Sequence, residues 1–259
     1  MNPQGIYTLV SGGKALEMQM DTVANNLANV DTVGYKQDQP TFKEVFARTM
    51  GVPQQSDEEV FAQPQFLPAY SGVGTTFVAP ADMGKDYEPG HLMSTGNTLD
   101  LALTTRQGFF TVRTPQGERY TRDGSFRLDK DNQLVTTDGY PVLGKSGPLV
   151  LQGNEVTVAQ DGTISVDGKP VGGFKVTAFP DPERLQKLGG NLFAPVDAAN
   201  NPRVMEGVQM AQGYLESSNV NPVRELTRMI EANRAYTSMQ KAVSSADEMN
   251  QRAISLAQV

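Results

Sequence analysis

Matching heptad patterns at the two ends of the chain constrain the fold more than any other feature. Apolar residues recur at steps of three and four near the N-terminus, and the same spacing returns near the C-terminus, interrupted at the polar Asn250. A 3.5-residue period is typical of coiled coils, and it gives a narrower apolar stripe than that of an ordinary surface helix. We therefore predict two terminal helices that pair. Their seams, through which subunits would also contact one another, comprise Ile6, Leu9, Leu16, Met20, Val23, Leu27 and Val30 and, at the other end, Met229, Ala232, Tyr236, Met239, Val243, Ala246 and Ala253.

The start of the N-terminal helix has two interpretations. Gly12 and Gly13 each cost roughly 1 kcal/mol inside a helix, so Ser11 could cap a helix that runs over residues 14–30. Alternatively, the helix begins near Pro3 and uses the glycines for close packing. Both interpretations stay open from the sequence.

Other helix boundaries have clearer signals. Gly34 follows the polar end of the N-terminal seam and is expected to stop the helix. Asn221 and Pro222 predict the N-cap and the first residue of the C-terminal helix, because proline lacks only a donor that would be unpaired there anyway.

Neither terminal helix is expected to be stable alone. The seven apolar side chains of the N-terminal seam would contribute roughly 10 to 20 kcal/mol if fully buried. Ordering about thirty residues costs roughly 1 to 2 kcal/mol each. We therefore expect both ends to be disordered or frayed in the monomer and to fold when many copies pack together.

The middle of the chain has a β pattern. Short alternating apolar runs are separated by the turn-forming pairs that begin at Asp123, Asp138, Asp161 and Asp167, whose glycines supply the positive φ of tight hairpins. Such spacing predicts an antiparallel sheet, sandwich or distorted barrel. The expected plan is α+β, with an N-terminal helix (1–36), a connector (37–74), an all-β antiparallel central domain (75–215) and a C-terminal helix (216–259), the two helices pairing as a coiled-coil-like domain.

Composition excludes several classes of function. The formal net charge of −7 argues against a nucleic-acid partner, and the apolar runs are too short for a bilayer-spanning helix. The first thirty residues lack the pattern of a cleaved secretory signal peptide. There is no cysteine and His91 is the only histidine, so thiol chemistry, a paired-histidine metal site and a histidine-dependent triad lack their parts. We expect no catalytic residues, metal, cofactor or small-molecule substrate.

Three runs resemble the signatures of one protein family. The run from Ala24 to Lys36 (ANNLANVDTVGYK) is similar to the N-terminal signature of bacterial flagellar rod and hook proteins, and the run from Leu215 to Asn221 (LESSNVN) is similar to the C-terminal one. The run from Tyr120 to Phe126 (YTRDGSF) also resembles the family. The motif residues taken from these signatures are Asn25, Asn26, Leu27, Asn29, Gly34, Tyr35, Leu215, Asn219, Val220 and Asn221.

The resemblance implies a structural subunit of the flagellar basal-body rod (FlgF/FlgG type), which polymerises helically and transmits torque across the periplasm. It implies export by the flagellar type III apparatus without cleavage, and partners that are other copies of the chain and other proximal and distal rod proteins. The run Gly139–Gly144 and the pair Asn221-Pro222 favour a proximal-rod member, whereas the asparagine-rich motif and Tyr35 are nearer to the distal-rod pattern. Outside this family, a secreted β-rich adhesin and a peptidoglycan hydrolase are the competing functions.

Overall fold

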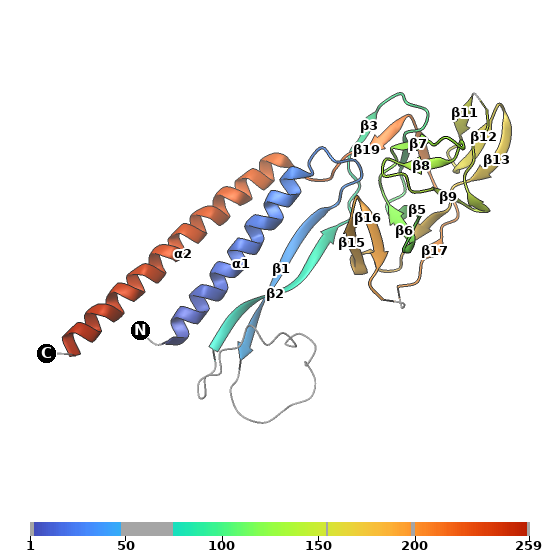
Figure 1. Ribbon diagram of the computed structural model, residues 1–259. Helices are drawn as coiled ribbons and strands as arrows, with labels where there is room; N and C mark the ends of the chain where they lie inside the picture. The colour runs from blue at the N-terminus through green and yellow to red at the C-terminus, as the bar shows by residue number, and fades with distance from the viewer. Residues whose placement is uncertain (1–2, 48–74, 154, 198–199, 258–259) are drawn as a thin grey trace. The chain divides into compact units, whose positions relative to one another are not determined.

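The computed structural model describes residues 3–47, 75–153, 155–197 and 200–257. A long helix lies at each end of the chain, α1 (Pro3–Ala28) and α2 (Pro222–Ala257), and β strands occupy the residues between them (Figure 1). This confirms the α+β class with a central antiparallel β region. None of the described helices is long and apolar enough to cross a membrane.

The chain divides into two compact units. One, the terminal unit, holds the described residues up to Thr22, those within Pro40–Met83, and those from Thr227 onward. The other, the central unit, comprises Val23–Gln39 and Gly84–Leu226. Both helices and the paired strands β1 (Gln37–Ala47) and β2 (Thr75–Asp86) contribute residues to both units.

Helix α1 begins at Pro3 and continues through both glycines, so the second of the two interpretations holds. A Cβ at Gly13 would lie 2.2 Å from Cε of Met239, whereas one at Gly12 would meet nothing within 4 Å. Gly13 therefore lets α1 and α2 approach closely within the terminal unit. The coiled-coil-like pairing over their whole length stays a prediction.

The seam residues of both helices are partly or fully covered. Val23, Ala232 and Ala246 are buried, and the other seam residues with described side chains are half-buried. Ile6 and Ala253 lie in the helices, but their side chains are outside the described set. Both ends are helical in this single chain, and the expectation that they order only on assembly remains to be tested.

The expected connector at residues 37–74 contains a strand that the sequence pattern did not predict. Residues Gln37–Ala47 form strand β1, which pairs with β2 in a two-stranded sheet. Its hydrogen bonds come from a strand beyond residue 74, which no local periodicity could indicate. Residues 48–74 lie outside the described part of the chain.

The central unit is built from short antiparallel strands. Its largest sheet has the order β15-β16-β6-β5-β14-β17, beside a three-stranded sheet β11-β12-β13 and the pairs β3–β19, β4–β18, β7–β8 and β9–β10. The strand bounds are β3 (Leu92–Ser94), β4 (Leu101–Leu103), β5 (Gly108–Thr114), β6 (Gly117–Thr121), β7 (Phe126–Leu128), β8 (Leu134–Thr136), β9 (Leu143–Gly144), β10 (Gly147–Pro148), β11 (Val156–Val158), β12 (Thr163–Val166), β13 (Lys169–Gly173), β14 (Val176–Ala178), β15 (Leu185–Gly189), β16 (Leu192–Pro195), β17 (Arg203–Val204), β18 (Met210–Gln212) and β19 (Tyr214–Glu216).

The core of the central unit is apolar and rich in aromatic side chains. The rings of Phe110 and Phe126 meet edge to face with centroids 5.0 Å apart, in a cluster that also buries Leu134, Val142 and Ile164. Edge-to-face rings stabilise a core beyond the area that they bury. The described members of the cluster all lie between Leu99 and Met210, so the cluster includes no residue of either terminal helix.

The turn prediction is confirmed at three of the four Asp-Gly pairs. Gly139, Gly162 and Gly168 adopt positive φ. Gly124 does not, and the prediction is wrong there. A Cβ at Gly124 would lie 1.6 Å from the carbonyl oxygen of Leu101, so this glycine is needed for close backbone approach.

Candidate functional site

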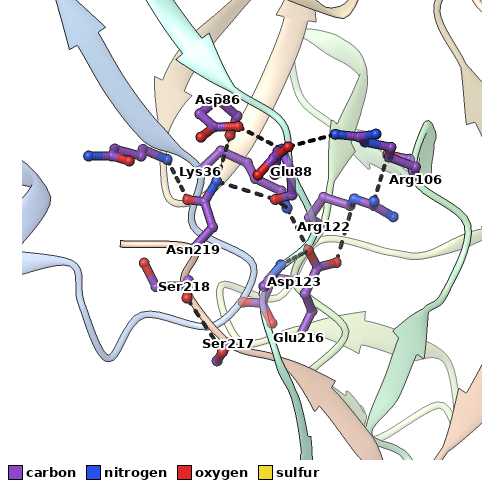
Figure 2. Close-up of polar contacts among 12 residues, drawn as sticks. Lys36, Asp86, Glu88, Arg106, Arg122, Asp123, Glu216, Ser217, Ser218 and Asn219 are labelled. Atoms are coloured by element: carbon purple, nitrogen blue, oxygen red, sulfur yellow. Dashed lines mark hydrogen bonds and ion pairs between the residues drawn. The ribbon is translucent and has the colours of Figure 1, made fainter. Parts of the chain in front are cut away.

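Three charged side chains meet in the interior of the central unit (Figure 2). Lys36 follows α1, Arg122 follows strand β6, and Glu216 ends strand β19. Their exposed fractions are 0%, 1% and 1%. Burying a charge is costly unless it is paired and hydrogen-bonded, so their contacts decide whether the arrangement is stable.

Lys36 is bound from two sides. Its Nζ donates to Oε1 of Glu216 and to the carbonyl oxygen of Glu88, the latter at 2.8 Å. The backbone N–H of Gly90 donates to the same Oε1 at 3.1 Å. Burial lowers the pKa of Lys36, and the Glu216 carboxylate opposes that shift.

Arg122 is held by backbone carbonyls and one carboxylate. Its two terminal nitrogens donate to the carbonyl oxygens of Thr105 (2.9 Å) and Arg106 (2.8 Å), and its guanidinium lies 5.6 Å from the centroid of the Phe109 ring. Its Nε lies 3.6 Å from Oε2 of Glu216, an oxygen that has no hydrogen-bond donor among the described residues. The Glu216 carboxylate thus pairs with two buried cations. We call Lys36, Arg122 and Glu216 the charged triad.

Asn219 connects three segments near the charged triad. Its Oδ1 accepts from the N–H of Gln37 at 2.8 Å, and its Nδ2 donates to the carbonyl oxygens of Asp86 (2.8 Å) and Glu88 (3.2 Å; Figure 2). One side chain therefore satisfies backbone groups at the start of β1 and the end of β2.

Asn26 and Glu225 form a second polar contact. The Asn26 amide pairs with the backbone of Asp38, donating to its carbonyl at 2.9 Å and accepting from its N–H at 3.0 Å. Glu225, in the first turn of α2, is fully buried and accepts from Nδ2 of Asn26 (3.3 Å) and Nε2 of Gln37 (2.8 Å). These bonds tie the end of α1 to the start of α2.

Tyr35 lies between the asparagines and a half-buried ion pair. Its hydroxyl is 2.9 Å from Oδ1 of Asn25 and 3.3 Å from Oδ2 of Asp38. Nζ of Lys187 binds the same Asp38 oxygen at 2.8 Å and lies 4.0 Å from the centroid of the Tyr35 ring. Burial, reinforced by the Asp38 carboxylate, raises the pKa of Tyr35.

Gly34 does not end the helix as expected. Helix α1 ends at Ala28, and Gly34 lies in the following loop with φ +67°. Its N–H donates to the carbonyl oxygen of Glu216 at 2.7 Å, and a Cβ there would lie 2.6 Å from the carbonyl carbon of Arg122. The glycine is required because the loop passes directly over the backbone of the charged triad.

Comparison with known proteins identifies the family. Family models match three segments, as a flagella basal body rod protein over residues 6–36, a flagellar hook protein FlgE/F/G D1 domain over 105–166, and a flagellar basal body rod FlgEFG protein C-terminal region over 211–256. The flagellar basal-body rod protein FlgG of Buchnera aphidicola subsp. Baizongia pistaciae is 33% identical, covering 95% of this chain and 97% of that protein.

The chain belongs to the flagellar basal-body rod family. The FlgG of Bacillus subtilis is 31% identical over 98% of both chains, and the FlgF of Caulobacter vibrioides is 33% identical over 96% of both. It is a family of structural rod proteins and not of enzymes. The adhesin and hydrolase functions are therefore set aside.

Each member of the charged triad comes from a different segment matched by the rod-family models. Lys36 is the last residue of the first segment, Arg122 lies in the second and Glu216 in the third. The three runs that resembled the family in sequence thus converge at one place in the central unit. The motif residues Asn26, Gly34, Tyr35, Leu215 and Val220 are also buried.

The remaining rod-family motif residues lie at the helix ends. Asn25 is exposed, and Nδ2 of Asn29 donates to its carbonyl oxygen at 2.8 Å, which pairs a carbonyl in the last turn of α1. Asn221 caps α2 as predicted, since its Oδ1 accepts from the N–H of Arg224 at 3.1 Å. Leu27 and Asn219 are half-buried.

We call the place where the three runs converge the junction, and sequence reasoning missed its charged members. Lys36, Arg122 and Glu216 lie inside the three runs that resembled the rod family, but nothing in the local pattern made them candidate site residues. A signal was available, because each of the three runs holds a charged residue, and the charges of Lys36 and Arg122 are opposite to that of Glu216. Lys187 and Glu225 carried no comparable signal.

Proposed function

We propose that the chain is a proximal-rod protein of the FlgF type that polymerises helically through its terminal helices into the drive shaft that crosses the periplasm. In this proposal the helices of residues 1–36 and 216–259 pair as a coiled-coil-like inner tube, and the β region of residues 75–215 forms the outer layer. The distal-rod protein FlgG is the second candidate, because relatives of both names match with near-equal identity over almost the whole chain.

Apolar surface on the helices carries the proposal. Val223, Ile230 and Met249 on α2 are 72%, 53% and 58% exposed, and Val10 on α1 is 56% exposed. A helix that has apolar residues outside its intramolecular seam presents a surface that further helices can cover. Neighbouring copies and the other proximal and distal rod proteins are the proposed occupants. Assignment of the seam residues to subunit interfaces is part of the same proposal.

Imaging of purified rods tests the assignment. A tag would be placed in the central unit at the exposed Gly168 turn, and basal bodies would be purified from the organism that encodes the chain. The tag is expected at the proximal end of the rod. A label along the distal rod would reassign the chain to the FlgG type, and a chain absent from purified basal bodies would overturn the rod proposal.

Export by the flagellar type III apparatus is tested on the same material. We expect the protein recovered from basal bodies to retain its N-terminal residues, and its appearance outside the cytoplasm to stop when the flagellar export ATPase is inactivated. A trimmed N-terminus, or export that continues without the flagellar apparatus, would contradict this route.

A further inference from the structure

The charged triad joins segments that are far apart in the chain, and this separation affects the order in which they can fold. Lys36 and Glu216 are 180 positions apart, with Arg122 between them. Without residue 216, Lys36 and Arg122 have only backbone carbonyls as acceptors among the described residues. Two unpaired cations in a buried position strongly disfavour the docked arrangement.

The same C-terminal segment supplies further polar partners of the N-terminal motif, in addition to Lys187 and Asn191 of the β region, which donate to the carbonyl oxygens of Lys36 and Val33. The carbonyl oxygen of Glu216 accepts from Gly34, Oδ1 of Asn219 accepts from Gln37, and the Glu225 carboxylate accepts from Asn26 and Gln37. Without residues 216–225, the motif would bury several donors without partners, and each would cost free energy.

The β core has no such dependence. Its cluster uses side chains between Leu99 and Met210, and backbone bonds such as Leu134 N–H to Leu149 (2.8 Å) and Val142 N–H to Leu134 (2.9 Å) are internal to it. The core can therefore order before the C-terminal segment is present, whereas docking of the motif at that stage would leave the cations of Lys36 and Arg122 without their carboxylate.

We propose that the charged triad is a completion lock: residues 23–39 dock on the β core only after residues 216–225 have joined it. In a chain that emerges N-terminus first, from a ribosome or a channel, residues 23–39 then stay undocked until nearly all of the chain is available. The relevance to export rests on the proposed function, but the lock itself is a property of the isolated chain. Its failure would leave the rod assignment intact, and the reverse is also true.

The amide of Asp38 gives the sharpest test, because its acceptor is the nearby Asn26 and not the C-terminal segment. In refolding with pulsed hydrogen exchange, the lock predicts that this amide is protected together with Ser217, which donates to His91, and later than Leu134 and Val142. Protection of Asp38 before Ser217 would overturn the proposal.

Substitution of the shared carboxylate provides the second measurement. In Glu216→Gln, native-state protection at Asp38 should fall at least about a hundredfold while protection at Leu134 is kept, because breaking a buried pair leaves an uncompensated charge. Glu118→Gln, which removes the partly exposed pair with Lys175 in the same unit, is the matched control and should leave Asp38 unchanged. Unchanged protection in Glu216→Gln, or loss of protection at Leu134 as well, would each show that the triad is not a lock.

Discussion

Replacement of Gly34 by alanine separates two reasons why a loop needs glycine. At φ +67° the left-handed backbone conformation of an alanine lowers the free energy of unfolding by roughly 1 to 2 kcal/mol. In addition, its Cβ would lie 2.6 Å from backbone atoms of Arg122 and Asp123, which cannot rotate away as a side chain would. Overpacking of this kind costs typically about 1 to 3 kcal/mol more. The free energy of unfolding of Gly34→Ala should therefore be about 2 to 5 kcal/mol lower than that of the unmodified chain.

Gly96 is the matched control. It lies in the same unit with φ +72°, and a Cβ there would meet nothing within 4 Å. Gly96→Ala should cost only the backbone part, roughly 1 to 2 kcal/mol. The difference between the two variants isolates the contact with the charged triad.

Urea unfolding followed by far-ultraviolet circular dichroism and tyrosine fluorescence measures both variants. With a slope of about 1 to 3 kcal/mol per molar urea, a contact cost of about 2 kcal/mol separates their midpoints by about 0.7 to 2 M. The slope itself should stay constant. Equal midpoints for Gly34→Ala and Gly96→Ala would refute the argument that the loop is pressed onto the backbone at residues 122–123.

Three further predictions concern the helices and the junction. Met239→Asp should abolish rod incorporation because a charge would enter the half-buried seam, whereas Ser244→Asp on the exposed side should not. Soft-agar motility, together with circular dichroism of the purified chains, checks this prediction. Motile Met239→Asp cells would exclude the seam assignment. Gly12→Ala should stabilise α1 by about 0.5 to 1 kcal/mol, and Gly13→Ala by less because Met239 must move, which helix content during thermal unfolding compares. Above pH 10.0, the usual pKa of tyrosine, the unfolded chain loses the Tyr35 proton while the folded chain keeps it. The free energy of unfolding should therefore fall as the pH rises past 10. Tyr35→Phe should make that fall less steep in urea titrations between pH 8 and 11.

The parts of the fold that could be predicted were those set by local spacing. The 3.5-residue period located both helices, and Asn221 with Pro222 placed the start of α2 at the observed residue. Strand β1 was missed because its partner β2 begins beyond residue 74, and pairing at that separation leaves no trace in the local pattern. The glycine at position 124 was misassigned for a related reason, since its neighbour Leu101 is distant in sequence.

The junction was predicted as a set of motifs and not as a site. The amide and glycine residues of the runs belong to the family signatures, whereas a lysine, an arginine and a glutamate are locally typical of solvent-exposed charges. Only the topology of the central unit, which brings Glu216 between Lys36 and Arg122, makes them buried and mutually dependent. Such a charge pair adds little net stability over apolar residues of the same size, but loss of one member leaves the other uncompensated. The charges therefore destabilise the docked arrangement in incomplete chains more than they stabilise the complete chain. A measurement of the free energy of unfolding on the intact protein alone would underestimate their role.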